Sequence, residues 1–574
     1  MASPSNVKIH REIKIPLRDG VHVAATLYYS EPLETRRPCV FTLTPYTADS
    51  IHSRAVYFAS HGLRFLSIDV RGRGDSEGTF RPYLQEANDG YDVVEWIAKQ
   101  SYCSGKVAMC GGSYNGYGQW AAAKEHPPHL LTIVPTASCF CGVDFPMRNN
   151  IFYPFVLQWL TLTSGRTSKQ NLISDQSYWS SAFSIWHRSG RPFRDLDKQL
   201  GTSSSTFQEW LDHPEPDGYW DAYNPSDEQY AQIRIPILTI TGSYDDDQTG
   251  ALAHYKAHVK AVPADVANRH HLVIGPWDHA GTRTPTHEFG GLTFGPQSLI
   301  DLQQLHLEWY KWTLSDGAKP TFLVKRVAYY VMGAERWRYV DNLHEVTSHH
   351  VPYYLDSKGG ANHLFSSGSL KLTRGSGPPD GYTYDPRDVS GDEVEAESHA
   401  DGSSLTDQSL VLGLSGRLLV YHTDPFSQDT EVSGWFRLCA WISIDCPDTD
   451  LYAIVYEICS DGTSIRLSTD ALRARYREGL RSPSLIEVST PLQYTFDRFT
   501  FVSRLVKRGH RLRLVIAPIG RLVDATFTQK NYNGGDVVAE ESSAEGSPVT
   551  VRLYHNEEHS SALFVPIGQT TDSP

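Results

Sequence analysis

The chain has 574 residues, of which 40% are apolar, and a formal net charge of −14. That length predicts two or three domains, and the apolar content excludes a disordered chain. The acidic balance, without any run of lysine and arginine, excludes electrostatic binding to nucleic acid or to an anionic membrane surface. The sequence holds no stretch of about 18 apolar residues, so we expect no membrane span.

The N-terminal part alternates strand-like and helix-like segments. Residues 7–29 alternate in polarity around Asp19-Gly20, which predicts a β-hairpin. Residues 39–44 predict a strand, and Pro45-Tyr46 follows it. The alternation continues to about residue 140, as a parallel sheet requires. An aromatic residue after a strand packs more often than it catalyses, so the local pattern leaves the role of Tyr46 open.

Ser113 lies in the most informative segment, Gly111-Gly112-Ser113-Tyr114-Asn115-Gly116. A strand-like run at 106–110 precedes it, and a helix-like run at 117–124 follows it. A serine on such a sharp turn has an exposed hydroxyl, and the turn needs small neighbours. The helix N-terminus offers backbone N–H groups to a developing oxyanion. These properties predict an acyl-transfer nucleophile.

An acid and a histidine follow the serine in the order found in α/β-hydrolases. Residues 237–242 predict a strand ending in glycine, after which comes Asp245. Residues 271–279 predict a second such strand, with His279 in the loop beyond it. The carboxyl ends of parallel strands carry the active-site groups in such a fold. We expect Ser113 to attack a carbonyl, His279 to transfer its proton and Asp245 to orient the imidazole.

Nearby side chains leave alternatives open. Asp246 or Asp247 could replace Asp245, which is preferred because it comes first after the strand. His270 and His271 lie at the start of their strand, the wrong end for catalysis, so we expect them to be structural or to face solvent.

The alternation stops between residues 145 and 230, in a stretch rich in aromatic residues and helical in pattern. Its place between the serine and the acid predicts a cap. Most of its rings should form the core of the cap, and a few should wall a pocket for an apolar or aromatic acyl group. Phe152, Phe155 and Trp159 are the candidates for that wall.

The rest of the chain is mainly β in pattern. Residues 299–314 predict the helix that closes the α/β part, and short strands with turn-rich spacers from about 320 predict a sandwich. Residues 375–403 are rich in Gly, Ser, Pro and Asp and predict a long loop. Strand edges in this part could pair with a second copy, so a homodimer is among the expectations.

Five short motifs follow one another along the α/β part of the chain. They are Pro45-Tyr46, the segment 69–78, Ser113-Tyr114-x-Gly116, Gly242-x-Tyr244-Asp245 and Gly275-Pro276-Trp277-x-His279. In this order they resemble the bacterial cocaine esterase family, the CocE/NonD group, which is related to X-prolyl dipeptidyl aminopeptidases and α-amino-acid ester hydrolases. Matches at 330–333, 448–450, 475–477 and 509–511 extend the resemblance over nearly the whole chain.

The resemblance implies an α/β-hydrolase core with an inserted helical cap and a C-terminal jelly-roll β-sandwich. The implied domains are the core at 1–144 and 231–318, the cap at 145–230 and the sandwich at 319–574. It also implies the triad Ser113, Asp245 and His279, with an oxyanion hole formed by the Tyr46 hydroxyl and the Tyr114 backbone N–H.

The chain departs from one related group. In α-amino-acid ester hydrolases a cluster of carboxylates surrounds the substrate's ammonium group. The matching positions here are Asp247, Gln248 and, by a loose alignment, Asn150, so one acid remains. The resemblance therefore predicts that a free α-amino group is not required, and that Asp247 would be its ligand if one binds.

The sequence predicts no cofactor and no metal site. Its eight cysteines form no disulfide framework, and Cys139-Phe140-Cys141 is spaced too tightly for a zinc pair, so buried free thiols are expected. The first ten residues lack the apolar core of a signal peptide, which predicts a cytoplasmic location.

Together these patterns predict a serine hydrolase that cleaves a carboxylic ester of a small, partly apolar substrate through an acyl-enzyme. One rival is an X-prolyl-type dipeptidyl peptidase or amidase, with Asp247 as the amine ligand. A second is an acyltransferase with the same triad. A third is a non-catalytic binding module on the same scaffold. The expected partner is a small ester or amide.

Overall fold

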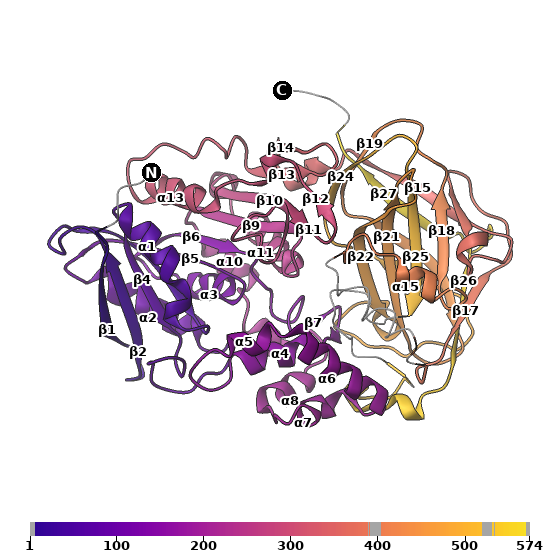
Figure 1. Cartoon of the computed structure of the whole chain (residues 1–574), viewed down its shortest axis with the longest axis horizontal. Helices are drawn as coiled ribbons and strands as arrows, with labels where there is room; N and C mark the ends of the chain where they lie inside the picture. The colour runs from indigo at the N-terminus through magenta and orange to yellow at the C-terminus, as the bar shows by residue number, and fades with distance from the viewer. Residues whose placement is uncertain (1–5, 389, 391–402, 519–530, 533, 570–574) are drawn as a thin grey trace.

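The computed structural model describes residues 6–388, 390, 403–518, 531–532 and 534–569 (Figure 1). A 10-stranded sheet with the order β1-β2-β4-β3-β5-β6-β9-β10-β13-β14 forms its first unit. These strands are β1 (Lys8–Pro16), β2 (His22–Tyr29), β3 (Arg37–Thr44), β4 (Arg64–Asp69), β5 (Cys103–Gly112), β6 (Leu130–Thr136), β9 (Ile237–Tyr244), β10 (His270–Asp278), β13 (Val327–Val331) and β14 (Arg336–Val340). The strands from β4 to β13 run parallel, and β1 and β2 form the predicted hairpin.

Helices cover both faces of this sheet. The main ones are α1 (His52–Ser60), α2 (Glu86–Ala98), α3 (Tyr114–Ala123), α11 (Gln248–Ala261) and α13 (Leu302–Leu314). Successive strand residues point to opposite faces. Phe41 and Met109 pack in the layer that contains α2 and α3, whereas Val40 and Ala108 pack in the layer of α1 and α13. Burial on both faces explains why these strands are continuous apolar runs in the sequence.

A helical insertion lies between β6 and β9 and forms the lower middle of Figure 1. It consists of β7 (Met147–Arg148), β8 (Ile151–Phe152), α4 (Phe155–Leu162), α5 (Gln170–Ile173), α6 (Gln176–Ser189), α7 (Leu196–Gln199), α8 (Ser205–Leu211), α9 (Gly218–Asp221) and α10 (Asp227–Gln232). Its buried aromatic rings, among them Trp179, Phe183 and Trp186, belong to the same apolar cluster as the layer of α2 and α3. The insertion therefore packs directly on the α/β unit.

The C-terminal unit is all-β and lies on the right of Figure 1. Its 13-stranded sheet consists of β15 (His349–Asp356), β16 (Gly368–Lys371), β17 (Asp380–Tyr384), β18 (Leu419–Thr423), β19 (Thr430–Gly434), β20 (Arg437–Ile444), β21 (Asp450–Ile458), β22 (Ser464–Arg473), β23 (Leu492–Phe496), β24 (Val502–Val506), β25 (Arg511–Pro518), β26 (Val549–Tyr554) and β27 (Ala562–Ile567). The predicted fold class, an α/β-hydrolase-like core with an all-β C-terminal domain, is confirmed.

Two sequence expectations differ from the structure in this region. The α/β unit was expected to end at residue 318, but β13 pairs in parallel with β10 and β14 pairs with β13, so the central sheet continues to Val340. The segment 375–403 was expected to be a loop, but it contains β17, which pairs with β26. The reason is Asp380, whose buried carboxylate accepts hydrogen bonds from Ser357, Tyr421 and His555. Residues 389 and 391–402 of that segment lie outside the described residues.

No helix in the described part of the chain has the length and apolarity that a membrane crossing requires.

A cluster of buried histidines lies between α11 and the sheet. His254 is fully buried; the Tyr230 hydroxyl donates to its Nδ1 at 2.6 Å, and its Nε2 donates to the Cys139 carbonyl at 3.1 Å. Nearby, Nδ1 of His258 and Nδ1 of His270 are 2.9 Å apart, which requires one ring to donate and the other to accept. Burial lowers the pKa of His254 to about 3 and also lowers the pKa of His258 and His270.

These histidines predict acid sensitivity of the fold. Their folded-state pKa values lie below the usual value of about 6.5, so the unfolded chain binds more protons between that value and the folded-state pKa. The stabilisation is complete above about pH 6.5 and is lost as the pH falls. We expect His254→Gln to reduce the slope of unfolding free energy between pH 5 and 6 by about 1.4 kcal/mol per pH unit. Urea denaturation at pH 5 and pH 6 measures this slope, and His349→Gln, at an exposed histidine, is the control. An unchanged slope in His254→Gln would contradict the assignment.

Candidate active site

Ser113 stands on the turn between β5 and α3, with φ 62° and ψ −128°. This strained conformation is typical of an exposed nucleophile on a strand-to-helix turn. A Cβ on Gly111 would come within 2.5 Å of the Asn115 Cβ, and a Cβ on Gly116 within 2.8 Å of the Thr136 carbonyl oxygen. Both glycines are therefore required by close packing, which explains the late glycine of the motif.

The other two predicted triad residues follow neighbouring parallel strands. Asp245 comes directly after β9 and His279 directly after β10. Nδ1 of His279 donates to Oδ1 of Asp245 at 2.8 Å, and the Thr241 hydroxyl donates to Oδ2 at 2.7 Å. The Asp247 backbone N–H also donates to Asp245, at 3.1 Å. The carboxylate thus fixes the tautomer and the orientation of the imidazole.

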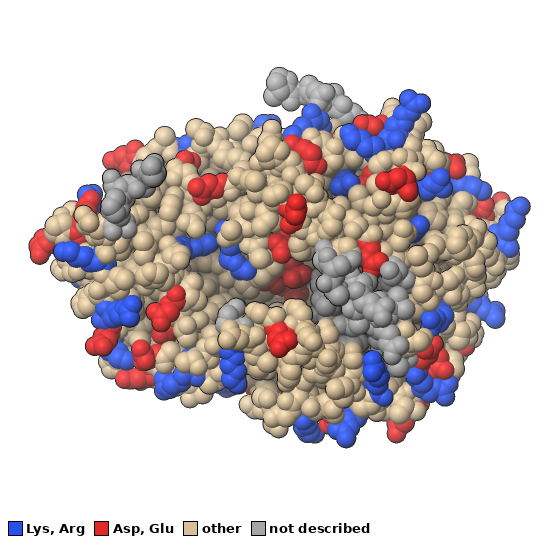
Figure 2. All heavy atoms as spheres, viewed as in Figure 1, with Lys and Arg blue, Asp and Glu red and all other residues tan. Residues whose placement is uncertain are grey.

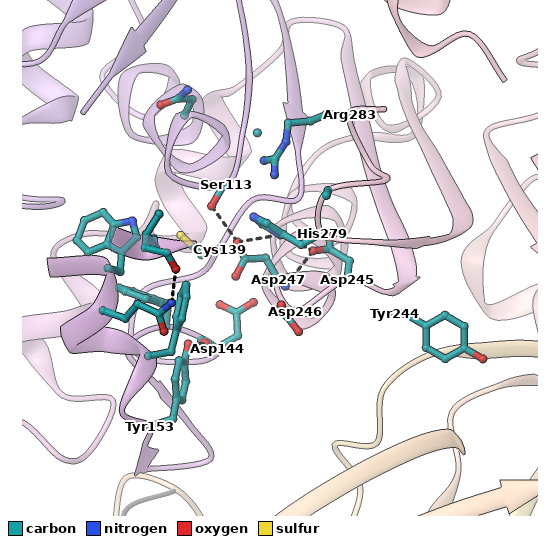
Figure 3. Close-up of a pocket in the computed structure, with 18 of the residues that line it drawn as sticks. Ser113, Cys139, Asp144, Tyr153, Tyr244, Asp245, Asp246, Asp247, His279 and Arg283 are labelled. Carbon is teal, nitrogen blue, oxygen red and sulfur yellow. Dashed lines mark hydrogen bonds and ion pairs between the residues drawn. The ribbon is translucent and has the colours of Figure 1, made fainter. Parts of the chain in front are cut away.

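The Ser113 hydroxyl points toward Asp247, to whose Oδ2 it donates at 3.5 Å (Figure 3). The same Asp247 oxygen is 3.9 Å from Nδ1 of His279. Ser113, His279, Asp245 and Asp247 therefore form one connected group. Catalytic hydrogen bonds commonly tighten only when substrate is bound, so this geometry is compatible with proton transfer from Ser113 to His279.

The charges around His279 oppose each other. Burial and the Arg283 guanidinium lower the pKa of His279, but its hydrogen bond to Asp245 and the charges of Asp247 and Asp245 outweigh them, so that its pKa is raised. Burial raises the pKa of Asp247 well above its usual value. Burial likewise raises the pKa of Asp144 to about 8. The carboxyl groups of Asp144 and Asp247 therefore favour the neutral form in the unliganded pocket.

Tyr46 and Tyr114 contribute different atoms. The Tyr46 hydroxyl lines the same pocket as Ser113 and accepts a hydrogen bond from Nε1 of Trp159 at 3.0 Å, which leaves its own proton to donate. Burial raises the pKa of Tyr46 to about 12, so this proton is retained. The Tyr114 side chain points away, donating to Glu86 and accepting from the Tyr83 N–H. Its backbone N–H lies in the first turn of α3, where no intrahelical acceptor exists.

These groups open onto a pocket of about 1080 Å³ where the core, the helical insertion and the C-terminal unit meet. Figure 2 shows the corresponding hollow at the centre of this face. Phe145, Tyr153, Phe155 and Trp159 form an aromatic wall. Of the predicted lining residues, Phe155, Trp159 and Asp247 are in place.

Phe152 does not line the pocket. It is buried in the apolar cluster of the α/β unit, whereas its neighbours Ile151 and Tyr153 line the cavity. The reason is the short β7–β8 hairpin, in which adjacent residues point to opposite sides. The expectation for Phe152 was therefore wrong by one position in register.

The acidic part of the pocket also differs from the expectation. Gln248 donates to the Gly242 carbonyl at 3.0 Å, and Asn150 donates to the Leu480 carbonyl at 2.6 Å, so both amides have structural partners. The second acid is instead Asp144, whose carboxylate lines the pocket and accepts from the backbone N–H groups of Phe140 and Gly250. One signal could have found it: Asp144 is the single charged residue between Leu130 and Met147.

One group of described side chains has the spacing of metal ligands, namely Glu457, Cys459 and His510 in the C-terminal unit. Glu457 already accepts hydrogen bonds from Arg504 and from Nδ1 of His510. The guanidinium thus occupies the place that a cation would take, and this group fits a structural ion pair.

Comparison with known proteins gives a consistent result. The profile of the X-Pro dipeptidyl-peptidase (S15 family) matches residues 19–281, and that of the X-Pro dipeptidyl-peptidase C-terminal non-catalytic domain matches residues 323–518. Cocaine esterase of Rhodococcus sp. (strain MB1 Bresler) is 26% identical over 98% of this chain and 99% of its own length.

Two solved structures share the fold over nearly the full length. An α-amino acid ester hydrolase superposes with a TM-score of 0.83 at 20% identity, covering 99% of this chain and 98% of that one. A CocE/NonD family hydrolase from Staphylococcus aureus superposes with a TM-score of 0.68 at 15% identity, covering 97% and 93%. The chain therefore contains a region of the X-Pro dipeptidyl-peptidase (S15) family, followed by the C-terminal non-catalytic domain of that family, and its relatives are serine hydrolases.

Proposed function

We propose that this protein hydrolyses a carboxylic ester through an acyl-enzyme on Ser113. The observation that carries the proposal is the convergence of the strained Ser113 turn, the Asp245–His279 hydrogen bond and the Tyr46 hydroxyl in one pocket. The full-length similarity to cocaine esterase supports an ester as the substrate class.

In this mechanism Oγ of Ser113 attacks the ester carbonyl while Nε2 of His279 takes its proton. The Tyr46 hydroxyl and the Tyr114 backbone N–H stabilise the oxyanion of the tetrahedral intermediate. The intermediate collapses, His279 returns the proton to the departing alcohol, and the acyl group stays on Ser113. A water molecule, activated by the same imidazole, then releases the acid. The aromatic wall around Trp159 suits a small, partly apolar acyl group.

The nucleophile is tested with p-nitrophenyl acetate and p-nitrophenyl butyrate. We expect both to be hydrolysed, and Ser113→Ala to lower kcat by at least about 10⁴-fold because the covalent route is lost. The exposed Ser60→Ala should leave kcat unchanged. A burst of about one equivalent without turnover would instead indicate an acyltransferase that lacks its acceptor, and full activity of Ser113→Ala would refute the proposed nucleophile.

The oxyanion donor is tested with Tyr46→Phe, which removes one hydroxyl and preserves the ring. We expect kcat to fall by roughly 10²–10³-fold with little change in KM, because the hydrogen bond strengthens only in the transition state. Tyr178→Phe, an exposed tyrosine of α6, is the matched control. A change confined to KM would show that the hydroxyl binds the ground state and would exclude the oxyanion role.

A second candidate, cleavage of substrates with a free amine, is favoured by Asp144 and Asp247. Their carboxyl groups line one side of the pocket, and Figure 3 shows both below Ser113. An incoming ammonium group would favour the ionised form of either acid and so offset their burial. X-Pro dipeptides and α-amino acid esters both carry such a group.

This candidate is tested with methyl phenylglycinate, methyl phenylacetate and Gly-Pro p-nitroanilide. If the acids bind an amine, the amino ester is preferred over its deaminated analogue, and Asp144→Asn lowers that preference by roughly 10-fold through loss of one charged hydrogen bond. The distant Asp388→Asn serves as control. Equal rates on both esters, unaffected by Asp144→Asn, would exclude an amine subsite, and cleavage of the anilide alone would favour the peptidase.

We further propose a cytoplasmic location and the formation of a homodimer. All eight cysteines are free, and six of them are buried, which suits a reducing compartment.

A further inference from the structure

One wall of the active-site pocket carries two arginines for which the mechanism has no use. Arg54 comes from α1, and Arg283 comes from the loop after β10. Within the described part of the chain, neither guanidinium forms an ion pair with a carboxylate. A partly buried cation without a counter-ion is costly unless water or a ligand satisfies its donors. Both side chains are partly exposed to the pocket, so their N–H donors are available to a ligand that enters it.

Both arginines lie along the same face of β5, next to the nucleophile. A Cβ built on Gly112, the residue before Ser113, would be 3.1 Å from Nη1 of Arg283. Arg54 lies beside the thiol of Cys110 and lowers its pKa, against the larger effect of burial. Residues two apart on a strand point to the same side and lie about 7 Å apart. Because Arg54 lies beside Cys110 and Arg283 beside Gly112, the two guanidiniums lie on the same side of β5.

Arg283 faces the reacting groups from the side opposite Asp144. Its charge lowers the pKa of His279, Asp247 and Tyr46, which places it near all three. Figure 3 shows Arg283 above Ser113 and His279, whereas Asp144 and Tyr153 lie below them. The pocket therefore carries Asp144 on one side of the reacting groups and Arg283 on the other.

Arg283 lies on the side of the active site from which the leaving group departs. Its backbone N–H donates to the Ala280 carbonyl at 3.0 Å, so it lies one turn beyond His279. His279 is the group that protonates the departing alcohol, and Tyr153 of the aromatic wall lies on the far side of Ser113 from Arg283 (Figure 3). An anion held by Arg283 would therefore belong to the alcohol part of the ester.

We propose that Arg283, assisted by Arg54, forms a subsite for a carboxylate on the alcohol part of the ester. The preferred substrates are then esters whose leaving group is a hydroxy acid or a phenolic acid. Arginine suits this role because its planar fork of N–H donors matches a carboxylate. The inference rests on the proposed ester hydrolysis and extends it to a substrate class.

The test compares two esters with the same acetyl group, 4-acetoxybenzoate and its neutral methyl ester. Their kcat/KM values are measured for the wild type, Arg283→Gln, Arg54→Gln and Arg283→Lys. Each variant is assayed on its own pH plateau, since loss of Arg283 also raises the pKa of His279. Arg191→Gln, on the exposed surface of the helical insertion, controls for the change in net charge.

We expect Arg283→Gln to lower kcat/KM for 4-acetoxybenzoate by roughly 10–100-fold and for the methyl ester by less than about 2-fold, because one charged hydrogen-bonded pair is lost. Arg54→Gln should show a smaller effect of the same kind, and Arg283→Lys should retain part of the preference. Equal losses on both esters, or no loss on either, would overturn the subsite.

A binding measurement separates this inference from the proposed function. Titration calorimetry of 4-hydroxybenzoate, the product of the anionic ester, needs no turnover. Its dissociation constant should rise in Arg283→Gln by roughly 10–100-fold and stay unchanged in Arg191→Gln. Equal affinity for wild type and Arg283→Gln would refute the subsite, even if the methyl ester is hydrolysed. Conversely, failure to hydrolyse either ester would refute the esterase alone, because product binding is read independently.

Discussion

The close approach of α3 to the end of β6 sets the geometry of the whole pocket. The Ser113 N–H donates to the Thr136 and Ala137 carbonyls at 3.0 Å each, and Gly116 leaves no room for a side chain against Thr136. This packing holds the serine in its strained conformation and directs the first N–H groups of α3 toward the same cavity. A larger residue at 116 would separate the helix from the sheet and lose both features.

The helical insertion and the core act as one unit around this turn. Nε of Arg73 donates to the Pro45 carbonyl at 2.8 Å, and its Nη1 donates to the Thr163 carbonyl at 2.6 Å, just beyond α4. The same helix carries Trp159, which donates to the Tyr46 hydroxyl. The α4 segment therefore holds Tyr46 in two ways: through Arg73, which binds the carbonyl of the preceding Pro45, and through Trp159, which binds the Tyr46 hydroxyl. The hydroxyl is thus a preorganised donor that does not need to move during the reaction.

The C-terminal unit completes the pocket and does more than cover it. Leu467, Ser468 and Thr469 of β22 are part of the lining, and Asn149 of the insertion donates to Asp470 at 2.9 Å. Ligand sites are common at such domain junctions, because three surfaces can enclose a cavity that none could form alone. Substrate selection is thus distributed over parts of the chain that are hundreds of residues apart.

The sequence by itself determined the fold class and the positions of Ser113, Asp245 and His279, because each signal is local: a strand, a glycine and a reactive residue at its carboxyl end. Only the tertiary structure decided that Ile151 and Tyr153 replace Phe152 in the pocket, that Asp144 supplies the second acid, and that Arg54 and Arg283 share a wall. These placements follow from the convergence of distant segments and from strand register, where a shift of one residue reverses the side-chain direction.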